Sequence, residues 1–415
     1  MADWLAELVD WSRRHAAAVA LVLLALSILG GYYTATHLSI DSNTNDLISP
    51  TVPWRQREAA MDRAFPQNTN LLVIVIDART SDLAEDAAAM LAERLRAMPQ
   101  LFHSVRIPEG GEFFRREGLL FLPKSDVQKF SDQIIAAQPL LGTLAADPSL
   151  RGIFDALGLL AKGAAHGAIE AAALANPLDE VSGAVEAALQ SRYAPISWQA
   201  LLTGRAATPH DLRSIILTQP VLDYRAIEPG ARAAAAVRET ARQLGLTEAR
   251  GVRVRMTGPV AFDDDQLATL TQGAGFTTAL SLGLLILWLA LALRSARLVI
   301  AIVTTLLIGL VACGTFAVGA VGALNPISAA FAVLFIGLAI DFGIQFSVRY
   351  RDERFRASDF ISALRRTGSG IGVAIATAAG ATAVGFFAFV PTDYIGVSDL
   401  GLIAGVGMLI ALAFT

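Results

Sequence analysis

One aspartate, Asp341, lies inside an apolar run that is long enough to cross a membrane. The run extends from Ala329 to Val348, and Asp341 lies about 12 Å, or roughly two helical turns, before Arg349. A carboxylate at bilayer depth costs roughly 2.5 to 3.5 kcal/mol on insertion scales, and such acids usually face a bundle interior and carry protons or ions. The alternative is a residue that reaches the interface, but an aspartate side chain is short. The sequence therefore indicates a relay carboxylate.

Three further polar residues could extend a relay around Asp341. Gln345 follows Asp341 by one turn on the same helix face and could hydrogen-bond the carboxylate. Thr377 and Thr382 lie in the next apolar run and could join a polar seam. Gln also joins neighbouring membrane helices, and Thr also bonds its own helix backbone. The sequence leaves both interpretations open for all three residues.

Other kinds of chemistry are not indicated. The five His residues show no ligand spacing, and the run 263–265 of three Asp more simply stabilises a helix start than binds a metal ion. The sequence contains no phosphate-binding loop and no nucleophile paired with a base. The single Cys313 excludes an intrachain disulfide. We therefore expect no metal, no cofactor, no ATP-driven step and no enzyme activity.

Composition points to a membrane protein with more than one unit. Hydrophobic residues make up 54% of the chain and charged residues 17%, which is below the roughly 25% of soluble domains. The length of 415 residues exceeds that of one compact domain. The net charge of -4 argues against a nucleic-acid partner.

Apolar runs divide the chain into membrane and exterior segments. The run 16–40 carries no charge and is too long for a signal-peptide core, so we predict an anchor helix. After a polar stretch over 41–265, five further runs occupy 266–415, at about 273–293, 298–318, 329–348, 368–390 and from Leu400. We therefore predict a polytopic α-helical membrane protein with about six membrane helices in this chain.

Arginine positions predict the orientation. Arg residues cluster in 1–15, between the second and third runs, and between the fourth and fifth runs. Positive loops stay in the cytoplasm, so the stretch 41–265 is expected in the periplasm of a bacterium, and the protein in its inner membrane. Residues 1–15 carry two Trp and predict an interfacial helix. The Arg-rich loop 349–366 could also contact anionic membrane lipids.

The exterior stretch predicts an α+β domain with a helical insertion. Strand, helix and strand follow one another at 70–77, 81–98 and 102–107, and again at 213–221, 229–246 and 252–260. This order is typical of a split βαβ fold. Residues 117–121 are a candidate third strand of the first unit. The insertion, about 125–211, is rich in Ala and Leu and predicts helices at 126–137, 150–164 and 178–191 that either enclose an apolar cavity or form a solid core.

The sequence stops at Thr415 inside the sixth apolar run. We therefore expect an N-terminal half, with the C-terminal half of the same chain as its partner. Transporters built from repeated halves are common.

Two motifs and the order of elements resemble the resistance-nodulation-division (RND) superfamily. The segment 337–345, Gly-Leu-Ala-Ile-Asp-Phe-Gly-Ile-Gln, followed by Arg-Tyr-Arg-Asp-Glu at 349–353, looks like the fourth-helix motif of MMPL-type lipid exporters. The segment 254–263 looks like that family's entry to the second helix. The resemblance covers the whole chain, and the helical insertion brings it near the hopanoid-biosynthesis-associated RND transporters.

The resemblance implies a proton/substrate antiporter. It implies that Asp341 is the proton-relay acid, and that its relay partner belongs to the second half. Multidrug members carry two adjacent acids, whereas Ile340 and Phe342 flank Asp341 here, which favours lipid cargo. Hopanoids are the leading substrate, with fatty-acid-derived lipids or small amphiphiles as the alternative, and a homo-oligomer is expected. Other readings are a protein-export accessory and a sterol-sensing-type sensor, which would tolerate loss of Asp341.

Overall fold

The computed structural model describes residues 2–110, 112–167, 175–190, 193–198, 207–271, 274–356 and 359–415. These residues form two compact units. The first comprises 1–64, 223–229 and 265–415, and the second comprises 65–222 and 230–264. Each unit has a hydrophobic core of its own. We call the first the membrane unit and the second the sheet unit.

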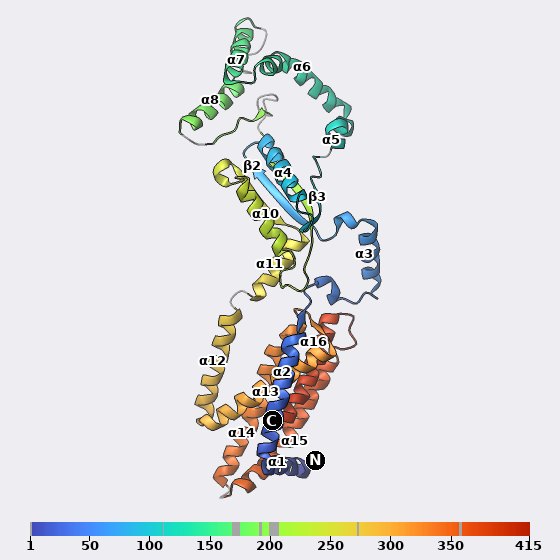
Figure 1. Cartoon of the computed structure of the whole chain (residues 1–415), viewed down its shortest axis with the longest axis vertical. Coiled ribbons are helices and arrows are strands. Elements are labelled where there is room, and N and C mark those ends of the chain that lie inside the picture. Colours follow the sequence, from blue (N-terminus) through green and yellow to red (C-terminus); the bar gives the residue numbers. More distant parts are fainter. Residues whose placement is uncertain are drawn as a thin grey trace. The chain divides into compact units, whose positions relative to one another are not determined.

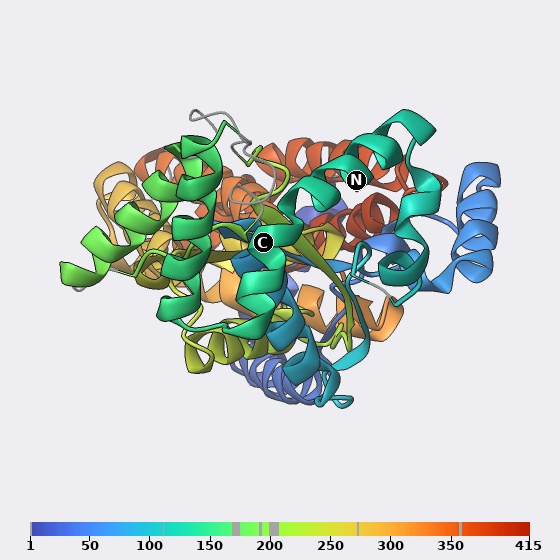
Figure 2. The same cartoon turned by 90° about the horizontal axis from the view of Figure 1, so that it is seen from above.

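In the described part of the chain, six helices are long and apolar enough to span a membrane. They are α2 (Ala16–His37), α12 (Ala274–Leu293), α13 (Ala296–Ala320), α14 (Phe331–Arg356), α15 (Phe360–Phe387) and α16 (Ile395–Phe414). Figures 1 and 2 show α15 and α16, drawn in red, side by side. The chain is therefore a multi-pass membrane protein, as its apolar runs predict.

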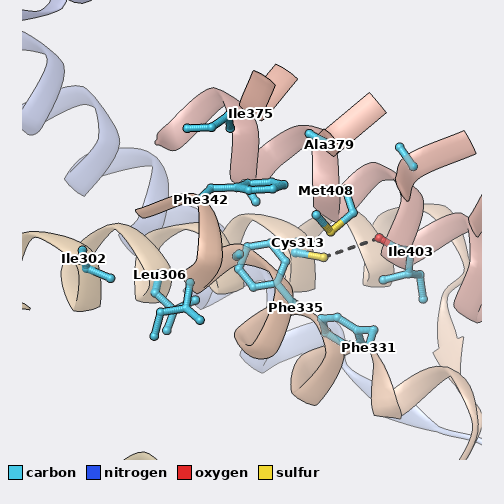
Figure 3. Close-up of a cluster of buried hydrophobic side chains, with 14 of the residues drawn as sticks. Ile302, Leu306, Cys313, Phe331, Phe335, Phe342, Ile375, Ala379, Ile403 and Met408 are labelled. Carbon is cyan, nitrogen blue, oxygen red and sulfur yellow. Dashed lines mark hydrogen bonds between the residues drawn. The ribbon is translucent and has the colours of Figure 1, made fainter. Parts of the chain in front are cut away.

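Phenylalanine side chains from α14 fill the middle of the membrane unit. Phe331, Phe335 and Phe342 are buried against residues of α15 and α16, among them Ile375, Ala379, Ile403 and Met408 (Figure 3). Cys313 of α13 is fully buried in the same cluster, and its Sγ donates to the carbonyl oxygen of Ile403 at 3.7 Å. Burial of this apolar stripe of α14 stabilises the membrane unit. Because this stripe faces the core, the stripe on the other side of the helix lies outside it.

The N-terminal helix α1 (Ala2–Arg14) packs across the start of α15. A Cβ added to Gly368 would lie 3.0 Å from Cγ2 of Val9, and one added to Gly372 would lie 3.0 Å from Cδ1 of Leu5. The two glycines therefore permit a close approach of the helices. Trp4, Leu8 and Trp11 stay exposed on α1, as expected for an interfacial helix.

The sheet unit contains a four-stranded antiparallel sheet in the order β3-β4-β2-β5. Its strands are β2 (Leu72–Ala78), β3 (Phe102–Arg106), β4 (Arg213–Pro220) and β5 (Val252–Thr257). The helix α4 (Ser81–Arg96) connects β2 to β3, and α10 (Ala231–Gln243) connects β4 to β5. In each case one other strand lies between the two connected strands, so the sheet has a split βαβ topology. Leu72, Ile74 and Ile76 alternate with less buried neighbours along β2, and face both helices in the core.

The strand expected at 117–121 is wrong. This segment continues α5 (Glu112–Glu117) as a 3₁₀ turn, η3 (Gly118–Phe121). A strand needs a neighbour for its backbone groups, whereas here Leu122 N–H bonds locally to the Leu119 carbonyl. The rings of Phe113 and Phe121 pack edge to face, with centroids 6.0 Å apart.

The insertion is helical, with α6 (Lys124–Ala146), α7 (Leu150–Ala165) and α8 (Ala175–Leu189). The apolar pocket between Leu144, Ile153, Leu157 and Val181 measures ≈ 20 Å³. This is about the space of one water molecule, so these helices enclose no ligand-sized cavity at this place. The predicted helix at 178–191 ends at Leu189, and residues 191–192 lie outside the described range.

Short elements complete the described chain. They are η1 (Thr44–Leu47), α3 (Pro53–Ala64), η2 (Pro66–Asn68), η5 (Glu248–Arg250), α11 (Pro259–Thr271) and η6 (Ser328–Ala330). In the membrane unit, β1 (Ser39–Ile40) pairs in parallel with β6 (Ala323–Leu324). The buried Ser42 hydroxyl donates to the Ala226 carbonyl at 2.7 Å. The β1–β6 pairing ties the end of α2 to the loop that precedes α14, and the Ser42 bond ties it to the segment 223–229.

Candidate proton-relay site

Helix α14 carries Asp341 near the middle of a spanning segment. At 1.5 Å per residue, Asp341 lies about 15 Å from the helix start at Phe331 and about 12 Å from Arg349. The helix runs on to Arg356, about two turns beyond the expected end at Val348. Asp341 is therefore as deep in the apolar segment as the sequence predicts.

Asp341 lies on the exposed stripe of α14. Val333, Gly337, Asp341 and Gln345 follow one another at a spacing of four residues, and all are exposed. Phe335, Ala339 and Phe342 occupy the buried face. The expectation that Asp341 faces the interior of the bundle is therefore wrong for this chain taken alone, because the aromatic stripe of α14 occupies that interior.

Gln345 shares the exposed stripe with Asp341, as their spacing of one turn predicts. Within the described residues, no hydrogen bond joins the Asp341 carboxylate to Gln345 or to any other side chain. The stripe places the two groups on one face without binding them together.

The two threonines of α15 differ in depth. The backbone of Gly370 in α15 lies next to the Arg349 guanidinium of α14, and a three-residue gap makes the two helices antiparallel neighbours. Counting from this contact, Thr377 lies about 10 Å and Asp341 about 12 Å along their helices, so the two are nearly level. Thr382 lies about 18 Å along α15, beyond that level.

Thr377 is exposed, and its Oγ1 donates to the Val373 carbonyl at 2.8 Å. It therefore satisfies its own helix backbone, the structural alternative for a membrane threonine. Thr382 is half-buried. The structure brings Asp341 and Thr377 to nearly the same depth, with Gln345 one turn of α14 closer to Arg349. Thr382 lies about 6 Å beyond the level of Asp341 on the other side.

Sequence reasoning missed a second carboxylate in the spanning helices, Asp399. A sixth helix beginning near Leu400 leaves Asp399 outside it, but α16 begins at Ile395. The Asn325 Nδ2 donates to Asp399 Oδ2 at 3.0 Å, and Asn325 Oδ1 accepts the Ser328 backbone N–H at 2.7 Å. No spacing connects Asn325 with a residue 74 positions later, so only a three-dimensional structure finds this pair.

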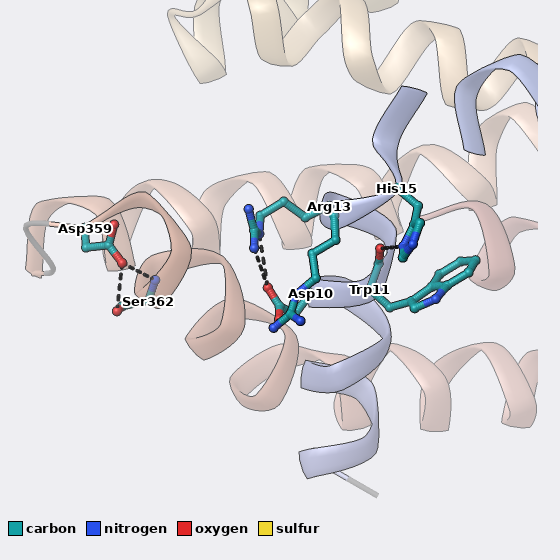
Figure 4. Close-up of polar contacts among 7 residues, drawn as sticks. Asp10, Trp11, Arg13, His15, Asp359 and Ser362 are labelled. Atoms are coloured by element: carbon teal, nitrogen blue, oxygen red, sulfur yellow. Dashed lines mark hydrogen bonds and ion pairs between the residues drawn. The ribbon is translucent and has the colours of Figure 1, made fainter. Parts of the chain in front are cut away.

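Ion pairs hold the Arg-rich end of the bundle. The Arg349 guanidinium donates to Glu353, which is buried, at 2.7 Å. Arg351 Nη1 donates to the Leu293 carbonyl at the end of α12, at 2.7 Å. In α1, Asp10 binds Arg13 and Arg14 (Figure 4), and hydrogen bonding from Arg13 is the main reason that the pKa of Asp10 lies below its ordinary value.

The start of α15 is fixed in the same way. Asp359 accepts the backbone N–H of Ser362 at 3.1 Å and caps the helix (Figure 4). This backbone hydrogen bond lowers the pKa of Asp359. The carboxylates at this end of the bundle are thus held by defined partners.

No metal centre is formed by the described residues: they contain no group of three or more His, Cys, Asp or Glu side chains placed to hold an ion. In the run 263–265, Asp264 is buried and accepts the Gly230 backbone N–H at 3.0 Å. It therefore positions the start of α10.

Comparison with known proteins finds a family and two individual proteins that resemble this chain. The MMPL family model matches residues 225–415, which include α12 to α16 and Asp341. This part of the chain is similar to the MMPL family. We call the matched residues the MMPL segment; they include the exposed stripe around Asp341.

Two curated proteins resemble nearly the whole chain. The "Hopanoid transporter HpnN" of Rhodopseudomonas palustris (strain TIE-1) is 41% identical over 407 residues, which cover 97% of this chain and 46% of that protein. The "Hopanoid transporter HpnN" of Burkholderia multivorans (strain ATCC 17616 / 249) is 38% identical over 411 residues, which cover 98% of this chain and 47% of that protein. The chain thus spans about half the length of these relatives.

Proposed function

We propose that this chain is part of a proton-driven RND transporter that moves hydrophobic lipids, hopanoids first among them, from the inner membrane toward the outer membrane. The observation that carries the proposal is the Asp341 carboxylate, which lies at mid-depth in the MMPL segment with no side-chain partner among the described residues. The names of the two relatives support the substrate class.

The exposure of Asp341 supports a covering partner. An aspartate at the centre of a membrane helix costs roughly 2.5 to 3.5 kcal/mol. Gly337 and Gln345 flank it on the exposed stripe, and Thr377 lies level with it on α15. Small and polar residues of this kind line contacts between membrane helices. We therefore place the part of the protein outside this chain, which accounts for about half of the relatives' length, against this stripe.

Proton exchange follows from such a cover. When apolar helices enclose the stripe, desolvation favours the neutral form of the Asp341 carboxyl. Protonation from the acidic side would then remove the charge and let α14 shift against its neighbour, and release to the other side would restore the charge. Gln345 would donate a hydrogen bond to the carboxylate in its charged form.

Arginine positions support the direction of transport. Arg13, Arg14, Arg351 and Arg365 lie at the ends or in the connections that we place in the cytoplasm. The sheet unit and the insertion are then periplasmic, on the side toward which the lipid leaves. We also propose a homo-oligomer, and this part of the proposal rests only on the resemblance to the RND superfamily.

The test is the substitution Asp341→Asn in the full-length protein, which keeps the size of the side chain and removes its proton exchange. Polycyclic lipid is measured in separated inner and outer membranes of cells that depend on this gene. The proposal expects lipid retained in the inner membrane at a normal protein level.

A matched control is Val333→Asn, which places the same amide two turns earlier on the same exposed stripe, where Val333 is 74% exposed. It should leave the lipid distribution near that of the wild type. Unchanged lipid distribution in Asp341→Asn would count against a relay and favour a sterol-sensing-type sensor.

A further inference from the structure

The membrane unit contains an apolar groove that the relay does not use. The groove measures ≈ 350 Å³ and is walled by α13, α14, the first turns of α15 and the last turn of α16. This volume falls within the roughly 300–1,000 Å³ of small-molecule sites. Six of its lining residues carry the argument below: Ala301, Ala339, Gly343, Phe346, Ser347 and Tyr350.

The groove lies at the Arg-rich end of the spanning helices. Ala301 is in the second turn of α13, and Tyr350 is one residue before Arg351, which binds the end of α12. The groove is thus at the depth of the leaflet next to the Arg-rich loops. The groove and the relay stripe lie on different faces of α14. Ala339, Gly343 and Ser347 follow one another along one side of the helix, and Asp341 and Gln345 lie on the opposite side.

One hydroxyl in the groove has no partner. Ser347 is only 6% exposed, and its Oγ makes no hydrogen bond to another residue that the structure describes. By contrast, the nearby Thr305 hydroxyl donates to the Ala301 carbonyl of its own helix at 2.9 Å. A buried hydroxyl is normally hydrogen-bonded, and leaving one unpaired is destabilising. Ser347 therefore presents an unused donor and acceptor in an apolar groove.

We propose that this groove binds the hydrocarbon part of a membrane amphiphile whose polar end carries a hydroxyl group, and that Ser347 hydrogen-bonds that hydroxyl. Ala301, Ala339 and Gly343 have little or no side chain, so they leave room for the hydrocarbon along α13 and α14. Ala301 is exposed and Thr305 half-buried at the rim, where a lipid of the surrounding membrane can enter. The site goes beyond the proposed function, because no relay residue lines it.

The experiment uses the full-length protein in liposomes with two photoreactive, alkyne-tagged probes, a sterol and a long-chain fatty alcohol. Labelled peptides are identified by mass spectrometry. Ala301→Trp places a large ring at the rim of the groove, and the matched control is Ile300→Trp at the neighbouring position, which is 64% exposed and does not line the groove. Labelling of the α13 and α14 peptides should fall at least roughly fivefold in Ala301→Trp and stay near the wild-type level in Ile300→Trp.

The hydroxyl contact has a test of its own. Ser347→Ala should weaken labelling by the hydroxyl-bearing probes by roughly threefold to tenfold, the range of one hydrogen bond. It should not weaken labelling by the deoxy analogues of the same probes, which lack the oxygen and can form no hydrogen bond with Ser347. Ser27→Ala is the control, because the Ser27 hydroxyl donates to the Leu23 carbonyl of its own helix.

The outcomes separate the possibilities. Groove labelling by the sterol alone identifies a polycyclic alcohol as the ligand, and labelling by both probes identifies a general hydroxylated amphiphile. Equal labelling in Ala301→Trp and Ile300→Trp means unspecific lipid contact and overturns the proposal. Asp341→Asn should retain groove labelling. The groove proposal can therefore hold even if the relay proposal is wrong, and the relay proposal can hold even if the groove proposal is wrong.

Discussion

The middle of α14 and the start of α16 each hold a carboxylate, and the two differ in what surrounds them. Asp399 in α16 accepts a hydrogen bond from Asn325, which also caps the turn before α14. Asp341 in α14 is exposed and bonded to no described side chain. A carboxylate costs more free energy the deeper it lies in the membrane, and Asp341 lies near the middle of its helix. We infer that Asp399 stabilises the fold through its hydrogen bond and that Asp341 exchanges protons.

The largest effect is expected from Asp341→Asn. The variant should reduce lipid transport by more than about tenfold, because a relay cannot work without a titrating group, while the protein level should stay near that of the wild type. Lipid in separated membranes and protein in immunoblots provide the two readouts. A variant that loses protein in proportion to transport would show that Asp341 is structural, and the contrast with Asp399 would disappear.

Asp399→Ala should show the opposite pattern. Removing the acceptor leaves the Nδ2 of the buried Asn325 unpaired, which costs about 1–3 kcal/mol of stability. Thermal unfolding of the detergent-purified protein should therefore occur at lower temperature than for the wild type. The double variant with Asn325→Ala should be less than additive, since both changes remove one contact. Strict additivity would mean that the hydrogen bond contributes nothing.

Smaller effects are expected from the neighbours of Asp341. Gln345→Leu should reduce transport by roughly threefold to tenfold if Gln345 donates one hydrogen bond to the charged carboxylate under cover. Thr377→Val should change transport by less than about twofold, because the Thr377 hydroxyl is already bonded to Val373. Initial rates of lipid transfer would rank the two, and a larger loss in Thr377→Val would revise the relay geometry.

The smallest effect concerns a held carboxylate of the sheet unit, Asp77 of β2. Burial acts to raise its pKa, but hydrogen bonds from Arg213 and Arg255 outweigh burial, and the pKa lies below its ordinary value. A lowered pKa stabilises the fold above the unfolded-state pKa of about 3.9, and this stabilisation is lost as pH falls through the folded-state pKa. Asp77→Asn should cost less than about 1 kcal/mol at neutral pH. Melting temperatures at pH 7 and at about pH 2.5 should differ less in the variant than in the wild type.

Residue periodicity predicts much of the fold. The six spanning helices and the split βαβ sheet follow from apolar runs and from alternation, which local sequence carries. Helix ends are less accurate: α15 begins at Phe360, eight residues before the expected start, because the helix continues through the Arg pair 365–366 in the charged region. The strand expected at 117–121 fails because no neighbouring strand is there to pair with it.

The sequence predicts where Asp341 and Gln345 lie along α14, but it does not predict that their side chains are exposed. Depth and face of Asp341 and Gln345 follow from helix geometry. Which face meets the core depends on Phe335 and Phe342 packing against α15 and α16, a long-range choice that periodicity does not contain. The same reason hid the Asn325–Asp399 pair and the Ser347 groove, since both join helices that are far apart in sequence.

The most direct test is proton movement in proteoliposomes that contain the purified full-length protein and its lipid substrate. An imposed pH gradient is followed with an internal pH-sensitive dye. The account predicts that lipid accelerates loss of the gradient with the wild-type protein and with Val333→Asn, and that Asp341→Asn abolishes this acceleration. Equal, lipid-dependent proton flux through Asp341→Asn would contradict the assignment of Asp341 as the relay.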